Sequence, residues 1–217
     1  MTRSTPSRLI LAITALGLAS PALAHPHVWV TAKAEIVYAP DSKVTAIRHA
    51  WTFDPAYSSY VTQGLDKNGD GKLSPDELQD LAKENAESLV DFDYFTALKA
   101  NGAKPALDAP RGYGMTFENG QVTLAFVLPL KAPARADKAL SLEVYDPSFF
   151  VSFSMAEGVD AVKLANAPKG CAATVTRPKP IEVGQGQKLS EAFFEALTAA
   201  SNSGANFDTN RVLVVCP

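Results

Sequence analysis

Residues 28–53 read VWVTAKAEIVYAPDSKVTAIRHAWTF, and apolar side chains alternate with others on both sides of Ala39-Pro40-Asp41-Ser42. Alternation with a period of two is typical of strands that bury one face, and a Pro-Asp-Ser segment is typical of a turn. This stretch therefore predicts a β-hairpin around which the rest of the chain is built.

The register of this hairpin predicts which side chains meet. If the turn pairs Tyr38 with Lys43, then His27 lies opposite Asp54 on the face that points away from the core. His49 falls on the other face, so we expect a buried, hydrogen-bonded core histidine rather than a metal ligand. That buried face consists of Val28, Val30, Ala32, Ala34, Ile36, Ile47, His49, Trp51 and Phe53.

A helical segment from about residue 55 to 91 follows the hairpin and contains a twelve-residue run, residues 66–77, that reads DKNGDGKLSPDE. Oxygen ligands occur at every position where an EF-hand calcium loop needs one, and Gly71 occupies the sharp turn. An ordinary turn followed by a capping box at Ser74 and Glu77 is the alternative. A single loop favours a structural calcium clip over a sensor. The expected calcium ligands are Asp66, Asn68, Asp70, the Lys72 carbonyl, Ser74 and Glu77.

The remainder of the chain reads as short strands. Asn119-Gly120 between two alternating segments is a strong hairpin signal, and a late helix is expected over residues 190–200. The fold class predicted is α+β, an antiparallel β-sandwich-like domain with an inserted helix-loop-helix. The further strands are expected over residues 94–99, 112–118, 121–130, 140–145, 149–155, 161–164, 172–176 and 212–215.

The first 24 residues indicate export. Two arginines precede an apolar run that ends in Ala22-Leu23-Ala24, the form of a secretory cleavage site, so residues 25–217 would form a single mature β-rich domain. An uncleaved amino-terminal anchor is the alternative. Cleavage changes the formal charge from −3 to −5, which gives no support for nucleic-acid binding. In an oxidising compartment the two cysteines, Cys171 and Cys216, are expected to form a disulfide rather than free or metal-binding thiols.

Cleavage would also place His25-Pro26-His27 at the amino terminus. A terminal amine and an imidazole can chelate copper, nickel or zinc, and Pro26 excludes the chelate that needs a deprotonated second amide. His25, His27 and, through the hairpin register, Asp54 are therefore candidate ligands for a transition metal. A solvated terminus that binds nothing is the alternative.

Evidence for catalysis is weak. Asp146, which precedes a proline, is expected to cap a turn, with a carboxylate at the edge of a binding surface as the alternative. The sequence contains no nucleophile elbow, P-loop, dinucleotide fingerprint or paired-cysteine zinc site. We therefore expect a protein that is not an enzyme.

Taken together, several segments resemble a bacterial family of exported proteins of unknown function, commonly labelled the periplasmic component of an uncharacterised ABC-type transport system. The resemblance covers nearly the whole mature chain and includes both cysteines. Its segments are His25 to Trp29, Trp51 to Asp54, the loop Asp66 to Glu77, Asp93 to Phe95 and Tyr145 to Val151.

The resemblance implies a periplasmic protein that works beside an inner-membrane metal transporter of the nickel or cobalt type. The chain nevertheless departs from a usual solute receptor, which has two α/β lobes around a cleft. We therefore expect a periplasmic metal-binding accessory protein for nickel, cobalt, zinc or copper, with structural calcium. The alternatives are a calcium-stabilised interaction module without a transition metal and a histidine-brace copper enzyme.

Overall fold

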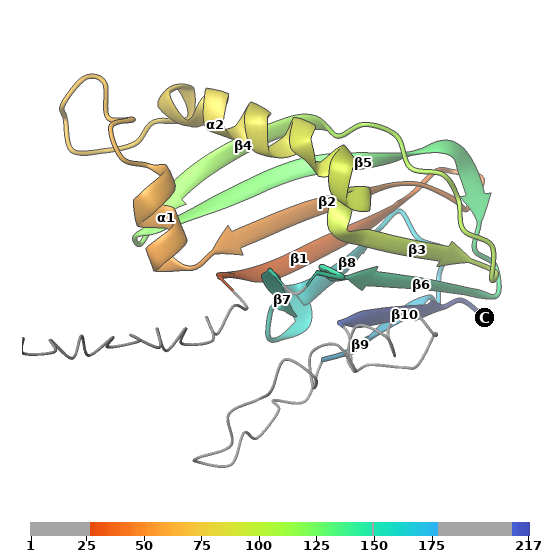
Figure 1. Ribbon diagram of the computed structural model, residues 1–217. Coiled ribbons are helices and arrows are strands. Elements are labelled where there is room, and N and C mark those ends of the chain that lie inside the picture. Colours follow the sequence, from red (N-terminus) through yellow and green to blue (C-terminus); the bar gives the residue numbers. More distant parts are fainter. Residues whose placement is uncertain (1–26, 149, 178–209) are drawn as a thin grey trace, which may run out of the picture.

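Two β-sheets and a pair of helices make up the fold in the computed structural model, which describes residues 27–148, 150–177 and 210–217 (Figure 1). The expected signal peptide, His25 and the expected helix over residues 190–200 lie outside these ranges. The helices are α1 Pro55–Val61, α2 Pro75–Ser88 and the 3-10 segments η1 Leu89–Phe95 and η2 Val159–Ala161. The strands are β1 Val28–Tyr38, β2 Lys43–Phe53, β3 Thr96–Ala100, β4 Arg111–Glu118, β5 Gln121–Arg135, β6 Ala139–Val144, β7 Val151–Met155, β8 Val162–Ala165, β9 Ala172–Thr176 and β10 Arg211–Val215.

The larger sheet, called sheet A, has the strand order β4-β5-β2-β1-β7, and β8 also pairs with β1. The strands from β4 to β1 are antiparallel, as predicted, and Asn119 and Gly120 form the β4–β5 turn with positive φ angles of 52° and 77°. Strands β7 and β8, however, run parallel to β1. The expectation of an antiparallel architecture is therefore wrong at this edge, because the chain reaches β7 from β6 of the other sheet and not through a hairpin from β1.

The predicted first hairpin is present, but its register differs by two residues from the prediction. Tyr38 pairs with Val44 rather than with Lys43, and Thr45 is an extra residue at a bulge, so Val30 lies opposite Phe53. The turn and the bulge each shift the pairing by one residue. A shift of two residues keeps the same side chains on the buried face. The alternation therefore predicted the buried face correctly although the predicted pairing was wrong.

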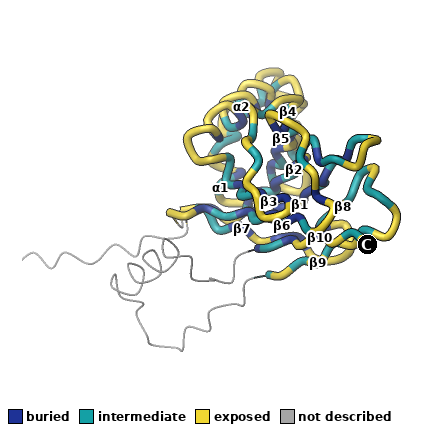
Figure 2. Tube along the Cα trace, turned by 90° about the vertical axis from the view of Figure 1, so that its right-hand side faces the viewer, coloured by how far each residue is buried: buried dark blue, intermediate teal, exposed yellow. Residues whose placement is uncertain are grey.

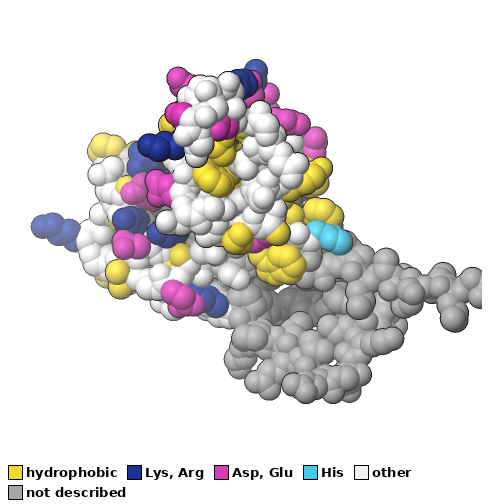
Figure 3. Space-filling view, turned by 90° about the vertical axis from the view of Figure 1, so that its left-hand side faces the viewer, with side chains coloured by type: hydrophobic (Ala, Val, Ile, Leu, Met, Phe, Trp, Pro, Cys, Tyr) yellow, Lys and Arg dark blue, Asp and Glu magenta, His cyan; other side chains and the backbone are white. Residues whose placement is uncertain are grey.

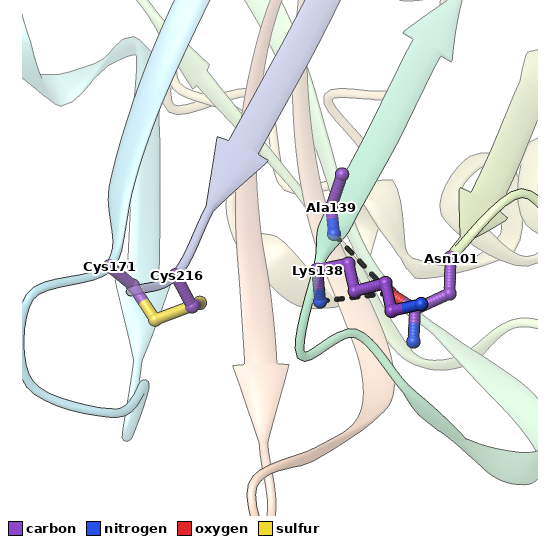
Figure 4. The surroundings of a disulfide bond; sticks show 5 residues. All are labelled: Asn101, Lys138, Ala139, Cys171 and Cys216. Carbon is purple, nitrogen blue, oxygen red and sulfur yellow. Dashed lines mark hydrogen bonds between the residues drawn. A yellow bond between two sulfur atoms is a disulfide. The ribbon is translucent and has the colours of Figure 1, made fainter.

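The smaller sheet, called sheet B, is antiparallel with the order β3-β6-β10-β9. Cys171 and Cys216 form the predicted disulfide at the ends of β9 and β10, with Cα atoms 4.1 Å apart. Asn101, in the turn after β3, accepts hydrogen bonds from the amides of Lys138 and Ala139 at the start of β6 (Figure 4). The disulfide thus joins the edge strand β9 to β10, and Asn101 joins the end of the other edge strand, β3, to β6.

The core lies on one face of sheet A. Across its strands Ala32, Trp51, Leu124 and Met115 stand at one level and all are buried. Sheet B covers this face near β1 and β2, and α2 packs against β4 farther along (Figures 1 and 2). On the opposite face β1 and β2 carry exposed or half-buried side chains, among them Thr31, Lys33 and Arg48, so these two strands are buried on one side only.

The two helices lie in the chain between β2 and β3, as the predicted insertion required. Helix α1 is attached to the sheet by Ser58, whose buried hydroxyl accepts from Val122 N over 3.0 Å and donates to Phe53 O over 3.4 Å. Helix α2 buries Leu78 and Ala82 in the core. In the part of the chain that the structure describes, no helix is long and apolar enough to cross a membrane.

Candidate metal sites

The loop between α1 and α2 contains the predicted calcium ligands, and it also contains the capping box. Helix α2 begins at Pro75, Ser74 N donates to Glu77 Oε2 over 2.9 Å, and Glu77 N donates to Ser74 Oγ over 3.4 Å. The chain turns at Gly69 and Gly71, whose φ angles of 72° and 78° favour glycine. The capping box accounts for the end of the loop and leaves the folding of residues 66–73 to be explained.

Asp66 organises that first part of the loop. Its Oδ1 accepts from Gly69 N over 2.8 Å and from Asp70 N over 3.2 Å, and its Oδ2 accepts from Gly71 N over 2.9 Å. Asn68 Oδ1 accepts from Asp70 N over 2.9 Å. The backbone is thus wrapped around the carboxylate at the first ligand position.

Glu77, at the last ligand position, reaches back across the loop. Its Oε1 accepts from Lys67 N over 2.9 Å and from Asn68 N over 3.4 Å, and its Oε2 also accepts from Ser74 Oγ over 2.8 Å. Hydrogen bonds, those from the backbone and side chain of Ser74 first, lower the pKa of Glu77 to about 2. Glu77 is therefore ionised at neutral pH, and it lies beside the residue that follows Asp66.

The donor set of this loop fits calcium chemically. It consists of oxygens, the ligands that a hard divalent cation prefers. Among the residues that the structure describes, no ion pair involves Asp66, Asp70 or Glu77. Three carboxylates in one short loop repel one another, and a divalent cation would remove that repulsion.

The ligand side chains are nevertheless not gathered around one point. Within the described ranges, no group of three His, Cys, Asp or Glu side chains is arranged to hold a metal ion. A physical reason lies in the hydrogen bonds, because Glu77 accepts four of them and a carboxylate has about four lone-pair sites. Bidentate calcium ligation would require one free lone pair on each oxygen, so Glu77 would give up the 3.4 Å bond from Asn68 at Oε1 and one of the two bonds from Ser74 at Oε2. Calcium binding therefore stays a prediction.

The predicted pairing of His27 with Asp54 is wrong, because the two-residue shift places Asp54 opposite Trp29. Asp54 N donates to Trp29 O over 2.9 Å, and Asp54 Oδ2 accepts from Trp29 N over 2.9 Å. Asp54 Oδ1 accepts from Tyr57 N over 2.9 Å and caps α1. The Asp54 carboxylate thus joins β1 to the first helix.

His27 lies beside the parallel strand β7 instead. His27 N donates to Phe150 O over 2.9 Å, and the two rings have centroids 5.0 Å apart. His27 is exposed, and Figure 3 shows a histidine bordered by hydrophobic side chains at this end of the molecule. Its role as a metal ligand together with His25 stays a prediction.

His49 is the buried core histidine that the alternation predicted. Thr96 Oγ1 donates to Tyr94 O over 2.8 Å, so its oxygen accepts a hydrogen bond from the Nε2–H of His49 over 3.3 Å. The imidazole stacks on Phe126, and burial lowers the pKa of His49 to about 3. A neutral ring in an apolar core has a structural role.

Two buried polar side chains form hydrogen bonds with backbone groups of β7. Asp146 accepts from Ser148 N over 2.8 Å and from Val151 N over 2.9 Å, which agrees with the predicted turn-capping role. Asn210, which the sequence did not single out, donates to Phe153 O and accepts from Met155 N over 2.8 Å. These hydrogen bonds of the two side chains go to backbone groups at the edge of the sheet, which is a structural role.

Comparison with known proteins supports a family but names no ligand. A family model described as "Protein of unknown function (DUF1007)" matches residues 10–216. A similar protein from Spirochaeta aurantia, described as "Uncharacterized 15.5 kDa protein in trpE 3'region", is 31% identical over 114 residues, which are 52% of this chain and 81% of that protein. Neither description mentions calcium, a transition metal or transport.

Proposed function

The chain belongs to the DUF1007 family of proteins of unknown function, and we propose that it is an exported, non-enzymatic calcium-binding accessory protein of a membrane metal transport system. The observation that supports the proposal is the loop Asp66 to Glu77, in which Glu77, at the last ligand position, accepts a hydrogen bond from the amide of Lys67, the residue after the first ligand position. The disulfide between Cys171 and Cys216 supports an oxidising compartment, and the apolar leader supports a periplasmic one.

In this proposal calcium is a brace and not a switch. Helix α1 is already fixed to the sheet through Asp54 and Ser58, and α2 through Leu78 and Ala82. Calcium between them would stiffen the connecting loop without separating the helices. The ion therefore stabilises the inserted helices and takes no part in catalysis.

Isothermal titration calorimetry tests the calcium assignment. The wild-type protein should bind one calcium ion, and Glu77→Gln, which removes the bidentate carboxylate, should weaken binding at least about tenfold. Asp76→Asn is the matched control, because it removes a neighbouring charge at a position that ligates nothing. Equal affinities for wild type and Glu77→Gln would overturn the assignment.

A transition-metal role rests on the amino terminus. His27 is exposed at the start of β1, where a ligand from the preceding residues could join it. Asp54 is already bonded to two backbone amides, so His25 and His27 are the principal ligands in this proposal. The pair would hold nickel, cobalt, zinc or copper for exchange with an inner-membrane transporter.

Titration of the chain processed to begin at His25 tests this role for each of the four metals. Binding should be lost in His27→Ala and reduced when one glycine is added before His25, because the added residue moves the terminal amine away from the imidazole. Binding that both changes leave intact would refute the terminal site. Absence of binding in the unmodified chain would leave a calcium-stabilised interaction module.

A further inference from the structure

A shallow groove of about 560 Å³ lies between α1 and α2. Its apolar lining comes from Tyr57, Val61 and Leu81, and Tyr60 at the rim is 73% exposed. Tyr57 donates its hydroxyl proton to Asn85 Oδ1 over 3.3 Å and so links the two walls. An exposed tyrosine beside an apolar lining is typical of a protein-binding surface.

The groove belongs to the acidic part of the molecule. Residues 55–91 contain eight acidic residues and three lysines, a net charge of −5, whereas the rest of the chain contains 17 basic and 15 acidic residues. Glu84 lines the groove, and its charge adds to burial in raising the pKa of the Tyr57 hydroxyl. Figure 3 shows acidic side chains above the hydrophobic ones at this end of the molecule.

The walls of the groove are held in place before any partner binds. Ser58 joins α1 to β5 and Asp54 caps its first turn, while Leu78 and Ala82 anchor α2 in the core. Binding to a preformed surface loses little conformational freedom. The lining on α2 extends from Leu81 to Ser88, about 10 Å of helix, which suits about two turns of a docked helix.

We propose that this groove docks a cationic, amphipathic helical segment of a partner protein. Charge decides between the possible occupants, because residues 55–91 keep a net charge of −3 even with one calcium ion bound. A second copy of this chain would bring the same acidic segment, and an anionic lipid surface would be repelled. Apolar side chains of the partner would pack on Tyr57, Val61 and Leu81, and its lysines or arginines would face Glu84 and neighbouring carboxylates. The inference rests on the proposed accessory role and names the chemistry of the partner.

Fluorescence anisotropy with a labelled Lys/Leu amphipathic peptide tests the docking site on the full mature chain in calcium. Saturable one-to-one binding is expected, and the Glu/Leu counterpart should not bind. The double variant Tyr60→Ser/Glu84→Gln should weaken binding at least about tenfold. Trp29→Ser and Glu157→Gln are matched controls that remove an exposed aromatic residue and an exposed acid elsewhere, and they should bind like wild type.

Several results would overturn the proposal. One is that the peptide fails to show saturable binding, and another is that the controls lose as much affinity as the double variant. A dimer that Tyr60→Ser abolishes would identify a second copy as the occupant, and vesicle binding that depends on Tyr60 would identify an anionic lipid surface. Circular dichroism of each variant verifies that the fold is intact. Because calcium binding is measured separately by calorimetry, a chain that binds calcium but not the peptide refutes the groove alone.

Discussion

Substitutions at Glu77 can separate its two roles, because glutamine is accepted in a capping box whereas only the carboxylate can ligate calcium through both oxygens. Wild type at calcium about 100-fold above its Kd should gain about 2.7 kcal/mol. For a chain of 217 residues this raises the Tm by about 5–11 °C. We expect Glu77→Gln to lose that increment. Glu77→Ala should lose it too and also unfold earlier in EDTA, since loss of a cap costs about 1 kcal/mol.

Differential scanning calorimetry of the three proteins in EDTA and in calcium measures both effects. The Tm in EDTA should fall in the order wild type, Glu77→Gln, Glu77→Ala, and only wild type should respond to calcium. Asp76→Asn should respond to calcium as wild type does. A calcium-dependent rise in Glu77→Gln equal to that of wild type would show that the loop is only a turn and a helix cap.

Three further outcomes test the fold around the site. Asn210→Ala leaves Phe153 O and Met155 N without their buried partner and should cost about 2–4 kcal/mol in urea unfolding; a loss below about 1 kcal/mol would show that the edge of β7 does not need it. His49 stays neutral in the folded protein down to about pH 3 but is protonated near pH 6.5 when unfolded. Stability should therefore fall from pH 6.5 to 3 by up to about 1.4 kcal/mol per pH unit, and His49→Leu should flatten this slope; an unchanged slope would refute the burial argument. Replacing Cys171 and Cys216 by serine should lower the unfolding free energy by about 4 kcal/mol, and an unchanged urea midpoint would contradict that estimate.

Features set by local sequence were predictable. The alternation over residues 28–53 gave both strands and the buried face, since a period of two is fixed by the strand geometry. Asn119-Gly120 located the second hairpin, because both residues tolerate the positive φ angles that its turn requires. The capping box at Ser74 and Glu77 was identifiable because its three-residue spacing is local, whereas the calcium ligands stay a prediction.

Features set by distant contacts were not predictable. The bulge at Thr45 changed the register, and with it the neighbour of Asp54, without changing the hydrophobic pattern. The parallel pairing of β7 with β1 depends on how the chain returns from sheet B. Asn210 closes the edge of β7 from a position more than 50 residues away in sequence, and a lone asparagine carries no signal for such a role.

A crystal structure grown in calcium tests the central claim most directly. We expect one strong anomalous peak in the loop between α1 and α2, about 2.3–2.6 Å from oxygens of Asp66, Asp70 and Glu77. In that structure Glu77 should have exchanged its hydrogen bond from Asn68, and one of its two hydrogen bonds from Ser74, for the ion. A loop without a peak, in which Glu77 still accepts from the amides of Lys67 and Asn68 at saturating calcium, would contradict the account.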